Sequence, residues 1–319
     1  MIDFRYHLVS LVSVFLALAV GIVLGAGPLK ESIGDTLADQ VSSLRAQKDE
    51  LRAELNTAQA GLAHRDEFTS ALVPALVPGT LSGRSVVLIT LPEADSGMAK
   101  PLQETLKKAG ATVTGKLDLT SQWTDADGAE RREALAEVLD RIVPGTDALA
   151  DTAEGRLAAL LARAVVARNF AESQKVDRPA TTLLSELVEA GLVKGSVSGR
   201  STTAVVLAPP VAQPGRDGTA PTPGRGTGEW VTVARSLDKV CTGTVILGPA
   251  SSATEEGLVA TVRAAADTQG LSTVDTGGSP MGTLGVVLAL KEQVTGAAGS
   301  YGFGEGARRP LPPLTEEDT

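Results

Sequence analysis

The chain has 319 residues and carries a formal net charge of −9, with 38 acidic against 29 basic side chains. This acidic balance argues against a nucleic-acid partner, because phosphate binding requires a basic face and the release of counterions. Aromatic residues make up only 3% of the chain, so a hydrophobic core must be built from Val, Leu, Ile and Ala. The length allows one large domain or two modest ones.

The first apolar segment predicts a membrane anchor over residues 1–29. Residues 8–29 carry no charge, and these 22 positions at about 1.5 Å each span about 33 Å, enough for a hydrocarbon core of about 30 Å. Arg5 and Lys30 bracket the run. The alternative is a cleaved signal peptide, since residues 25–27 offer small residues at a plausible cleavage site. The run is longer than the apolar core of a usual signal peptide, which favours the retained anchor.

Two glycines in this segment, Gly21 and Gly25, lie one helical turn apart on one face. Small residues at this spacing let two membrane helices approach closely, although the motif is also frequent by chance. Charged residues flank the run on both sides, so the positive-inside rule does not settle the orientation. We expect a single-pass protein in the lipid bilayer of the cell membrane, with the rest of the chain on the extracytoplasmic side.

After Pro28 the pattern changes to a heptad repeat, which predicts a coiled-coil stalk over residues 30–73. The apolar seam of a and d positions is formed by Leu37, Val41, Leu44, Leu51, Leu55, Ala58 and Leu62. Lys48 occupies one a position, where a polar residue costs stability but fixes the register. This sustained seam favours pairing between helices, and therefore a homo-oligomer. The alternative is that the helix packs back on its own domain.

A strand–helix–strand unit follows the stalk. Residues 84–91 form a short apolar run rich in β-branched side chains, as expected for a buried strand. Residues 99–109 have helical character, and Gly110 is a natural helix stop before a second strand at residues 111–114. This order is typical of a parallel sheet with a right-handed crossover.

The same alternation continues along the chain. Helices are predicted at residues 129–142, 153–170, 181–190 and 254–268, and further strands at residues 203–208, 244–247 and 272–274. Near-continuous apolar strands between helices predict a mainly parallel, Rossmann-like α/β domain over residues 83–298, with both faces of the sheet covered. Residues 209–228 form a Pro/Gly-rich insertion that predicts a flexible loop. Residues 299–319 predict an irregular C-terminal tail.

The sequence contains no convincing catalytic or cofactor-binding motif. Residues 91–98, the first strand-to-helix turn, lack the glycines that let a backbone approach a pyrophosphate. The two histidines, His7 and His64, lie in the anchor and the stalk, which argues strongly against a hydrolase triad. Residues 277–282 join a strand end to a helix start, and we interpret them as a tight turn or, alternatively, an anion site. We expect neither enzymatic activity nor a cofactor.

The side chains that suit a soft metal ion are scattered. The candidates are Met1, His7, His64, Met98, Cys241 and Met281. Met1 and His7, six residues apart at one end of the predicted membrane helix, are the only pair close in sequence. Cys241 cannot form an internal disulfide, and at the entrance to a predicted strand it is interpreted as a small buried side chain or, alternatively, a metal-binding thiol. The metal-binding residues therefore stay unknown.

The N-terminal segment, residues 1–25, resembles the MctB family of actinobacterial copper transport proteins. The resemblance extends through the heptads and the Val-Val-Leu-Ile-Thr strand at residues 86–90 to residues 286–290 and the terminal motif at residues 299–302. It implies a role in copper homeostasis, with copper ion as the transported species and a channel proposed for the family. No metal-binding residue can be carried over from it.

Two functions are compatible with these observations. The first is a membrane-anchored copper-homeostasis protein that transports or exports copper as an oligomeric channel or as a channel subunit. One helix has no lumen, so such a channel requires several chains. The second is an envelope protein that does not transport copper and whose α/β head binds a protein or glycan partner. Copper sensitivity of a deletion strain separates these two hypotheses.

Overall fold

The computed structural model describes residues 4–26, 28–144, 146, 151–173, 175, 177–211, 226–254 and 256–314. The chain divides into two compact units, Met1–Arg65 and Asp66–Thr319. The flexible insertion predicted at residues 209–228 lies largely outside the described residues. The two units are described separately.

The first unit contains helix α1, Phe4–Ala26, and the first part of α2, Pro28–Leu76. Residues Phe4–Gly25 are long and apolar enough to cross a membrane, and none of that window is buried. Ser13 donates its hydroxyl proton to the Val9 carbonyl at 2.8 Å, which satisfies a polar group inside the apolar helix. A Cβ atom added at Gly21 or Gly25 would meet nothing within 4 Å, so this face of α1 is open.

Helix α2 carries the predicted seam on its surface. Leu44 and Leu51 are 63% and 64% exposed, and Leu37 and Leu55 are similarly exposed. The helical conformation of the predicted stalk is confirmed, because α2 spans it without interruption. The pairing of this helix in a coiled coil stays a prediction.

The second unit is built on one mainly parallel sheet, as the sequence predicts. Within the described residues its seven strands follow the order β3-β2-β1-β4-β5-β6-β7. The strands are β1 Ser85–Thr90, β2 Thr112–Leu119, β3 Val193–Val197, β4 Thr203–Leu207, β5 Thr244–Leu247, β6 Ser272–Val274 and β7 Ser300–Tyr301. Only the β2–β3 pair is antiparallel. In this order β2 lies on one side of β1 and β4 on the other. The direction in which the chain crosses from strand to strand therefore reverses between the adjacent strands β1 and β4.

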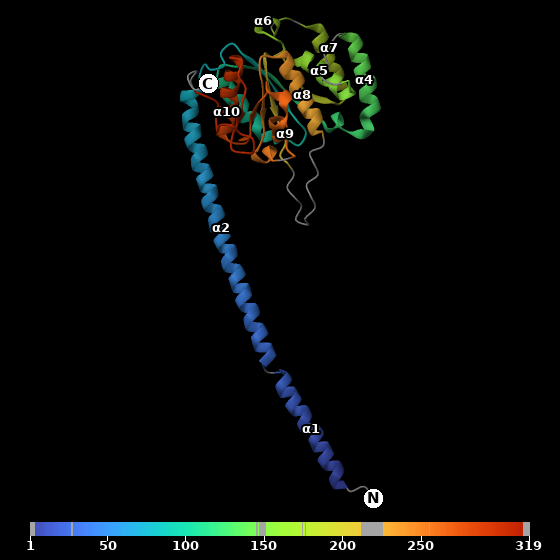
Figure 1. Cartoon of the computed structure of the whole chain (residues 1–319), viewed down its shortest axis with the longest axis vertical. Helices are drawn as coiled ribbons and strands as arrows, with labels where there is room; N and C mark the ends of the chain where they lie inside the picture. The colour runs from blue at the N-terminus through green and yellow to red at the C-terminus, as the bar shows by residue number, and fades with distance from the viewer. Residues whose placement is uncertain are drawn as a thin grey trace. The chain divides into compact units, whose positions relative to one another are not determined.

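Helices cover both faces of this sheet (Figure 1). They are α3 Ala99–Lys108, α4 Ala129–Ile142, α5 Ala153–Val165, α6 Phe170–Ser173, α7 Arg178–Glu189, α8 Thr227–Val240, α9 Leu258–Ala264 and α10 Pro280–Val294. Side chains alternate along β1, so Val87 and Ile89 enter a core with α4, α5, α7, α8 and α9. Val86 and Leu88 enter the opposite core with α3 and α10. Strands β1, β4 and β5 are buried throughout, which explains their unbroken apolar sequences.

The compact unit begins before Gly83, the boundary expected from the sequence. Val73, Val77 and Leu81 are buried in the core formed with α3 and α10. The backbone N–H of Leu81 donates to the Ala109 carbonyl at 2.9 Å, which fixes this segment against the end of α3. The last turns of α2 therefore belong to the α/β unit as well as to the stalk helix.

Two predicted helices are shorter in the structure. Residues 153–170 divide into α5 and α6, because Val166 leaves the helix to form a parallel bridge with Ser201. Residues 254–268 contain only α9 as an α-helix, flanked by the 3-10 turns Ala250–Ala253 and Ala266–Thr268. A Cβ at Gly257 would lie 2.1 Å from the Ser252 carbonyl oxygen, so the chain is tightly folded on itself just before α9.

A buried ion pair ties the C-terminal segment to the sheet. Arg263 and Asp275 are 3% and 1% exposed, and their Nη1 and Oδ2 atoms lie 2.9 Å apart. The guanidinium also donates to the carbonyls of Tyr301 and Glu305, each at 2.8 Å. Asp275 in turn accepts from the backbone N–H groups of residues 303 and 304. The segment predicted to be irregular thus contains β7 and a turn fixed by long-range hydrogen bonds.

Steric constraints in this turn require glycine at one position of the terminal motif. Gly302 has φ of 126°, a backbone region that favours glycine. A Cβ there would lie 1.8 Å from Oδ1 of Asp275, so no larger residue fits beside the carboxylate. Tyr301 is buried next to it, and its hydroxyl donates to Glu292 on α10.

We expect Asp275→Ala to lower the free energy of unfolding by about 3–5 kcal/mol, because it leaves the Arg263 guanidinium buried without its counter-charge. The matched control is Asp267→Ala, which removes a carboxylate that is 57% exposed and paired with Arg235. This control should cost about 1 kcal/mol or less. Urea unfolding of the full-length protein in detergent, followed by circular dichroism, measures both changes. Equal losses in the two variants would contradict the importance of the buried pair.

Candidate functional site

Two of the candidate metal-binding side chains in the α/β unit, Met98 and Cys241, lie at opposite ends of the parallel strands. Met98 ends the 3-10 turn after β1, and its Sδ would lie 2.9 Å from a Cβ on Gly277, which follows β6. The same Gly277 donates to the carbonyl of Gly248, directly after β5. Cys241 precedes β5, with Sγ 3.2 Å from Oγ1 of Thr244. β5, which is four residues and about 13 Å long, lies between the positions of the two sulfur atoms, so they are not placed to bind one ion.

The remaining candidates do not complete a site. Met281 lies in the first turn of α10, at the same end of the strands as Met98. His7 and His64 lie on exposed parts of α1 and α2, in the other compact unit. Met1, and with it the Met1–His7 pair, lies outside the described residues. Across the described part of the chain, no group of three or more His, Cys, Asp or Glu side chains is placed to hold a metal ion.

The thiol of Cys241 is a weak ligand in its own right. It is partly buried and lies 3.2 Å from both the Gly243 carbonyl oxygen and the Thr244 hydroxyl. Burial raises the pKa of the Cys241 thiol to about 11, and the charge of nearby Asp238 acts in the same direction. Since the thiolate is the form that binds metals and reacts as a nucleophile, Cys241 is largely inert at neutral pH.

The turn at residues 277–282 uses its own N–H groups. Ser279 caps α10, because its hydroxyl accepts from the N–H of Gly282 at 3.3 Å. Gly277 donates to Gly248 at 2.8 Å, and Thr283 donates to the Ser279 carbonyl at 3.4 Å. A Cβ on Gly282 would lie 2.3 Å from the Thr276 carbonyl oxygen. These contacts favour the tight-turn interpretation over an anion site.

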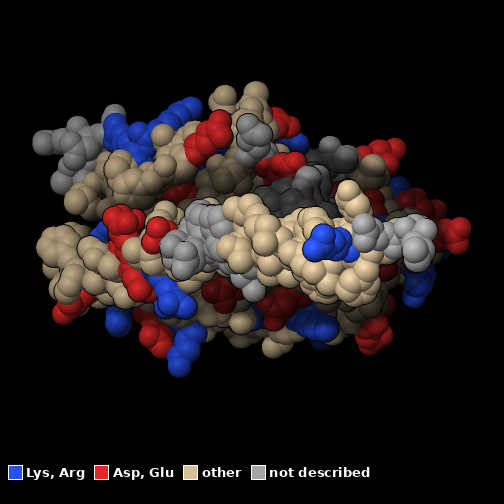
Figure 2. Space-filling view, turned by 90° about the horizontal axis from the view of Figure 1, so that it is seen from below, with Lys and Arg blue, Asp and Glu red and all other residues tan. Residues whose placement is uncertain are grey.

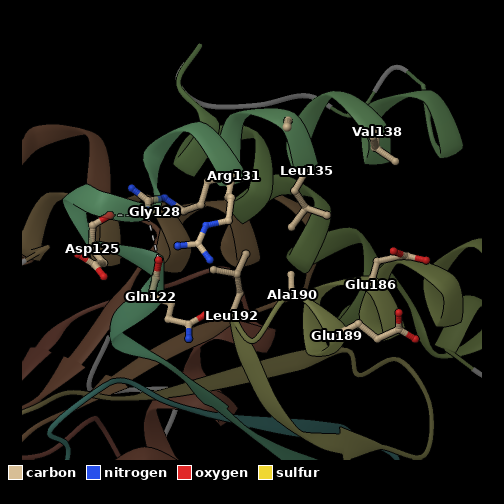
Figure 3. A pocket seen from close by; sticks show the side chains of 12 residues that line it. Gln122, Asp125, Gly128, Arg131, Leu135, Val138, Glu186, Glu189, Ala190 and Leu192 are labelled. Carbon is tan, nitrogen blue, oxygen red and sulfur yellow. Dashed lines mark hydrogen bonds between the residues drawn. The ribbon is translucent and has the colours of Figure 1, made fainter.

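A cavity of about 640 Å³ lies between α4 and α7. Figure 3 shows Arg131, Leu135 and Val138 on the α4 side of this cavity and Glu186 and Glu189 on the opposite side, on α7. The buried Arg132 forms one end by donating to the carbonyls of residues 122 and 125, at 3.0 and 2.6 Å. The wall thus combines apolar side chains with charges of both signs, and no local motif predicts it.

The face of the molecule in Figure 2 carries charges of both signs. On the face shown in Figure 2, acidic and basic side chains are interspersed rather than gathered into one field. A face of this kind lacks the basic stripe that tracks a nucleic-acid backbone.

The apolar N-terminal helix and the two-sided α/β unit define the chain as an α/β protein with a candidate membrane anchor. Residues 1–312 match the family model described as copper transport outer membrane protein, MctB, and the chain belongs to this family. Copper transporter MctB of Mycobacterium tuberculosis (strain ATCC 25618 / H37Rv) is 32% identical to it over 324 residues, which cover 96% of this chain and 98% of that protein. Copper transporter MctB of Mycobacterium leprae (strain TN) is 30% identical over 322 residues, with the same coverage. The resemblance noted in the N-terminal segment is confirmed.

The state of Cys241 can be tested by alkylation. Burial raises the pKa of the Cys241 thiol from an ordinary value of 9.0 to about 11, so the thiolate fraction at about pH 7.5 falls about 100-fold. We expect iodoacetamide to modify the folded full-length protein about 100-fold more slowly than the urea-unfolded chain. The rate should rise about tenfold with each pH unit, because each unit multiplies the thiolate fraction. The urea-unfolded chain is the control and should react at the free rate, whereas a rate that levels off below about pH 9 would contradict this assignment.

Proposed function

We propose that this protein is a membrane-anchored copper-homeostasis protein that transports or exports copper as an oligomeric channel or as a subunit of one. The observation that carries the proposal is the match to the copper transport family over residues 1–312, which includes the apolar helix as well as the α/β unit. The relatives over nearly the whole length are named copper transporters. The names of these relatives support copper as the proposed transported substrate, and no enzymatic role is proposed.

The anchor is proposed to stay on the mature protein and to assemble with other copies. A single helix satisfies its own backbone groups in lipid but encloses no path for an ion, so conduction requires several chains. The open glycine face of α1, at Gly21 and Gly25, suits close approach of two helices. The exposed leucines of α2 offer a second contact between copies.

Copper is proposed to pass without being held tightly by the α/β unit. Met98 and Cys241 stand at opposite ends of the parallel strands, and the Cys241 thiol is protonated at neutral pH. Residues Phe4–Gly25 include no Met, Cys or acidic side chain, although an ion path normally has polar residues within the membrane. This observation also favours the second hypothesis, in which the α/β unit is a head that binds a protein or glycan partner.

Deletion of the gene separates these two functions. If the protein exports copper, the deletion strain should accumulate copper and grow poorly in copper-supplemented medium, and the intact gene should reverse both changes. Cellular copper measured by mass spectrometry is the readout, with zinc as the control metal. Unchanged copper in the deletion strain would contradict the transport function and leave the partner-binding head as the better account.

Self-association through α2 is a separate prediction. We expect the full-length protein in detergent to contain about two to four chains. Replacing Leu44, Leu51 and Leu55 together by Glu should produce monomers, because three like charges then enter each seam. The matched control places the same three charges at outward f positions by Ala46→Glu, Ala53→Glu and Ala60→Glu.

Light scattering coupled to size-exclusion chromatography gives the protein mass of each particle after the mass of bound detergent is subtracted. The control variant should keep the mass of the unmodified protein. A monomeric unmodified protein, or an equal loss of mass in both variants, would show that α2 does not form the seam.

A further inference from the structure

The cavity between α4 and α7 lies beside an exposed apolar ridge on α4. The ridge, called the α4 stripe, is formed by residues spaced three or four positions apart, which share one face of a helix: Arg131, Leu135, Val138 and Ile142. Val138 and Ile142 are 43% and 40% exposed, and Leu135 is partly buried. The first three members of the stripe line the cavity of about 640 Å³. A hollow and an apolar ridge therefore stand side by side on this surface.

The opposite wall of the cavity is acidic. Glu186 and Glu189 lie in the last turn of α7, and Figure 3 shows both across the cavity from the α4 stripe. The carboxyl end of a helix carries a partial negative charge, so two carboxylates there are unfavourable without a nearby cation. The last turn of α7 contains no basic residue. This wall therefore favours a cationic side chain as its neighbour.

The charges on the two walls do not pair with each other. Within the described part of the chain, Arg131, Glu186 and Glu189 take part in no salt bridge. The neighbouring Arg132, in contrast, is bound to Glu154 at 2.8 Å. Arg131 and Glu189 are exposed, and Glu186 is partly exposed. All three can therefore pair with charges that another molecule supplies.

The α4 stripe has the chemistry that this cavity requires of an occupant. The cavity lining includes the apolar side chains of Ala190 and Leu192 beside the acidic wall of α7. A matching occupant presents a row of apolar side chains next to a basic one. The stripe presents Leu135, Val138 and Ile142 in such a row, with Arg131 at its start. A second copy of the chain therefore supplies a complementary ridge.

We propose that the cavity between α4 and α7 is an interface between two copies of this chain. A two-fold contact uses the same patch on both partners, so a ridge beside a matching hollow is self-complementary. The α4 stripe of each copy enters the cavity of the other. Arg131 of one copy then pairs with Glu186 and Glu189 of the partner subunit, and the reverse pair forms as well. This contact is distinct from the pairing of α2 and does not depend on it.

The contact is weak in isolation. Few apolar side chains enter each cavity, so we expect a Kd on the order of 100 µM. At the low concentrations used for light scattering, it adds no mass of its own. Copies that α2 holds together have a much higher effective concentration, so the contact forms readily between them.

Charge reversal tests this interface in the full-length protein. The background carries Glu at positions 44, 51 and 55, so that the pairing of α2 does not contribute. Sedimentation equilibrium in density-matched detergent, at up to about 0.5 mM protein, should show a dimer of the expected affinity. Arg131→Glu should weaken this dimer at least about tenfold, because both walls of the cavity then carry negative charge. Glu186→Arg combined with Glu189→Arg should weaken it as much, because both walls are then positive.

An equimolar mixture of these two variants is the decisive sample. An acidic patch then meets a basic one, so the mixed dimer should form at least about tenfold more tightly than either variant alone. Lys107→Glu is the matched control and should leave the dimer unchanged, because this exposed lysine lies on α3, which covers the opposite face of the sheet. Thermal unfolding confirms that each variant is folded.

Absence of a dimer in the background protein would overturn the proposal and leave the cavity to a different partner. So would a dimer that Arg131→Glu leaves intact, or one that Lys107→Glu weakens equally. A mixture that associates no better than its two components would also contradict a contact between copies.

Discussion

Burial of the central strands β1, β4 and β5 on both faces determines the rest of the α/β unit. A parallel ladder needs a crossover between successive strands, and each crossover helix covers one face. The end of α2 completes one of the two cores through Val73, while α5 and α8 fill the other. Because helices cover both faces of the sheet, polar side chains gather at the two ends of its strands.

The soft ligands are separated because they lie at opposite ends of the strands. Met98 follows β1 and Cys241 precedes β5, so the strand itself keeps the two sulfur atoms apart. No rearrangement of a side chain can bring them together without unpairing β5 from β4 and β6. Near the amino-terminal ends of β4 and β5, Asp177 instead pairs with Arg163 and Arg200, and such cationic side chains are not ligands for copper.

Much of the fold is predictable from the sequence, because local patterns carry it. The strands at β4, β5 and β6 were predicted to within one residue, since β4 and β5 are mainly apolar runs and all three are short β-branched segments between helices. Strand β3 was missed because it is an exposed antiparallel strand with Gly195 at φ of 102°, which reads as a turn. Helix α8 was missed because it directly follows the Pro/Gly-rich insertion. Strand β7 was missed because the distant Asp275 holds its turn in place.

The candidate sites were less predictable than the fold. The scattering of Cys, Met and His side chains was visible in the sequence, and the structure keeps Met98 and Cys241 apart. The cavity between α4 and α7 was not visible, because its two walls come from helices that are far apart in the sequence. The pKa of Cys241 likewise depends on burial in the folded protein, which its local sequence does not show.

The central claim is that copper is handled without a tight binding site formed by the side chains of the α/β unit. Competition titration of the full-length protein against a strong Cu(I) chelator tests it most directly, with Cys241→Ser as the matched variant. The account predicts a Kd of about 1 µM or weaker, unchanged by the substitution, because fewer than three soft ligands converge. A Kd of about 1 nM or tighter that is lost in Cys241→Ser would contradict it.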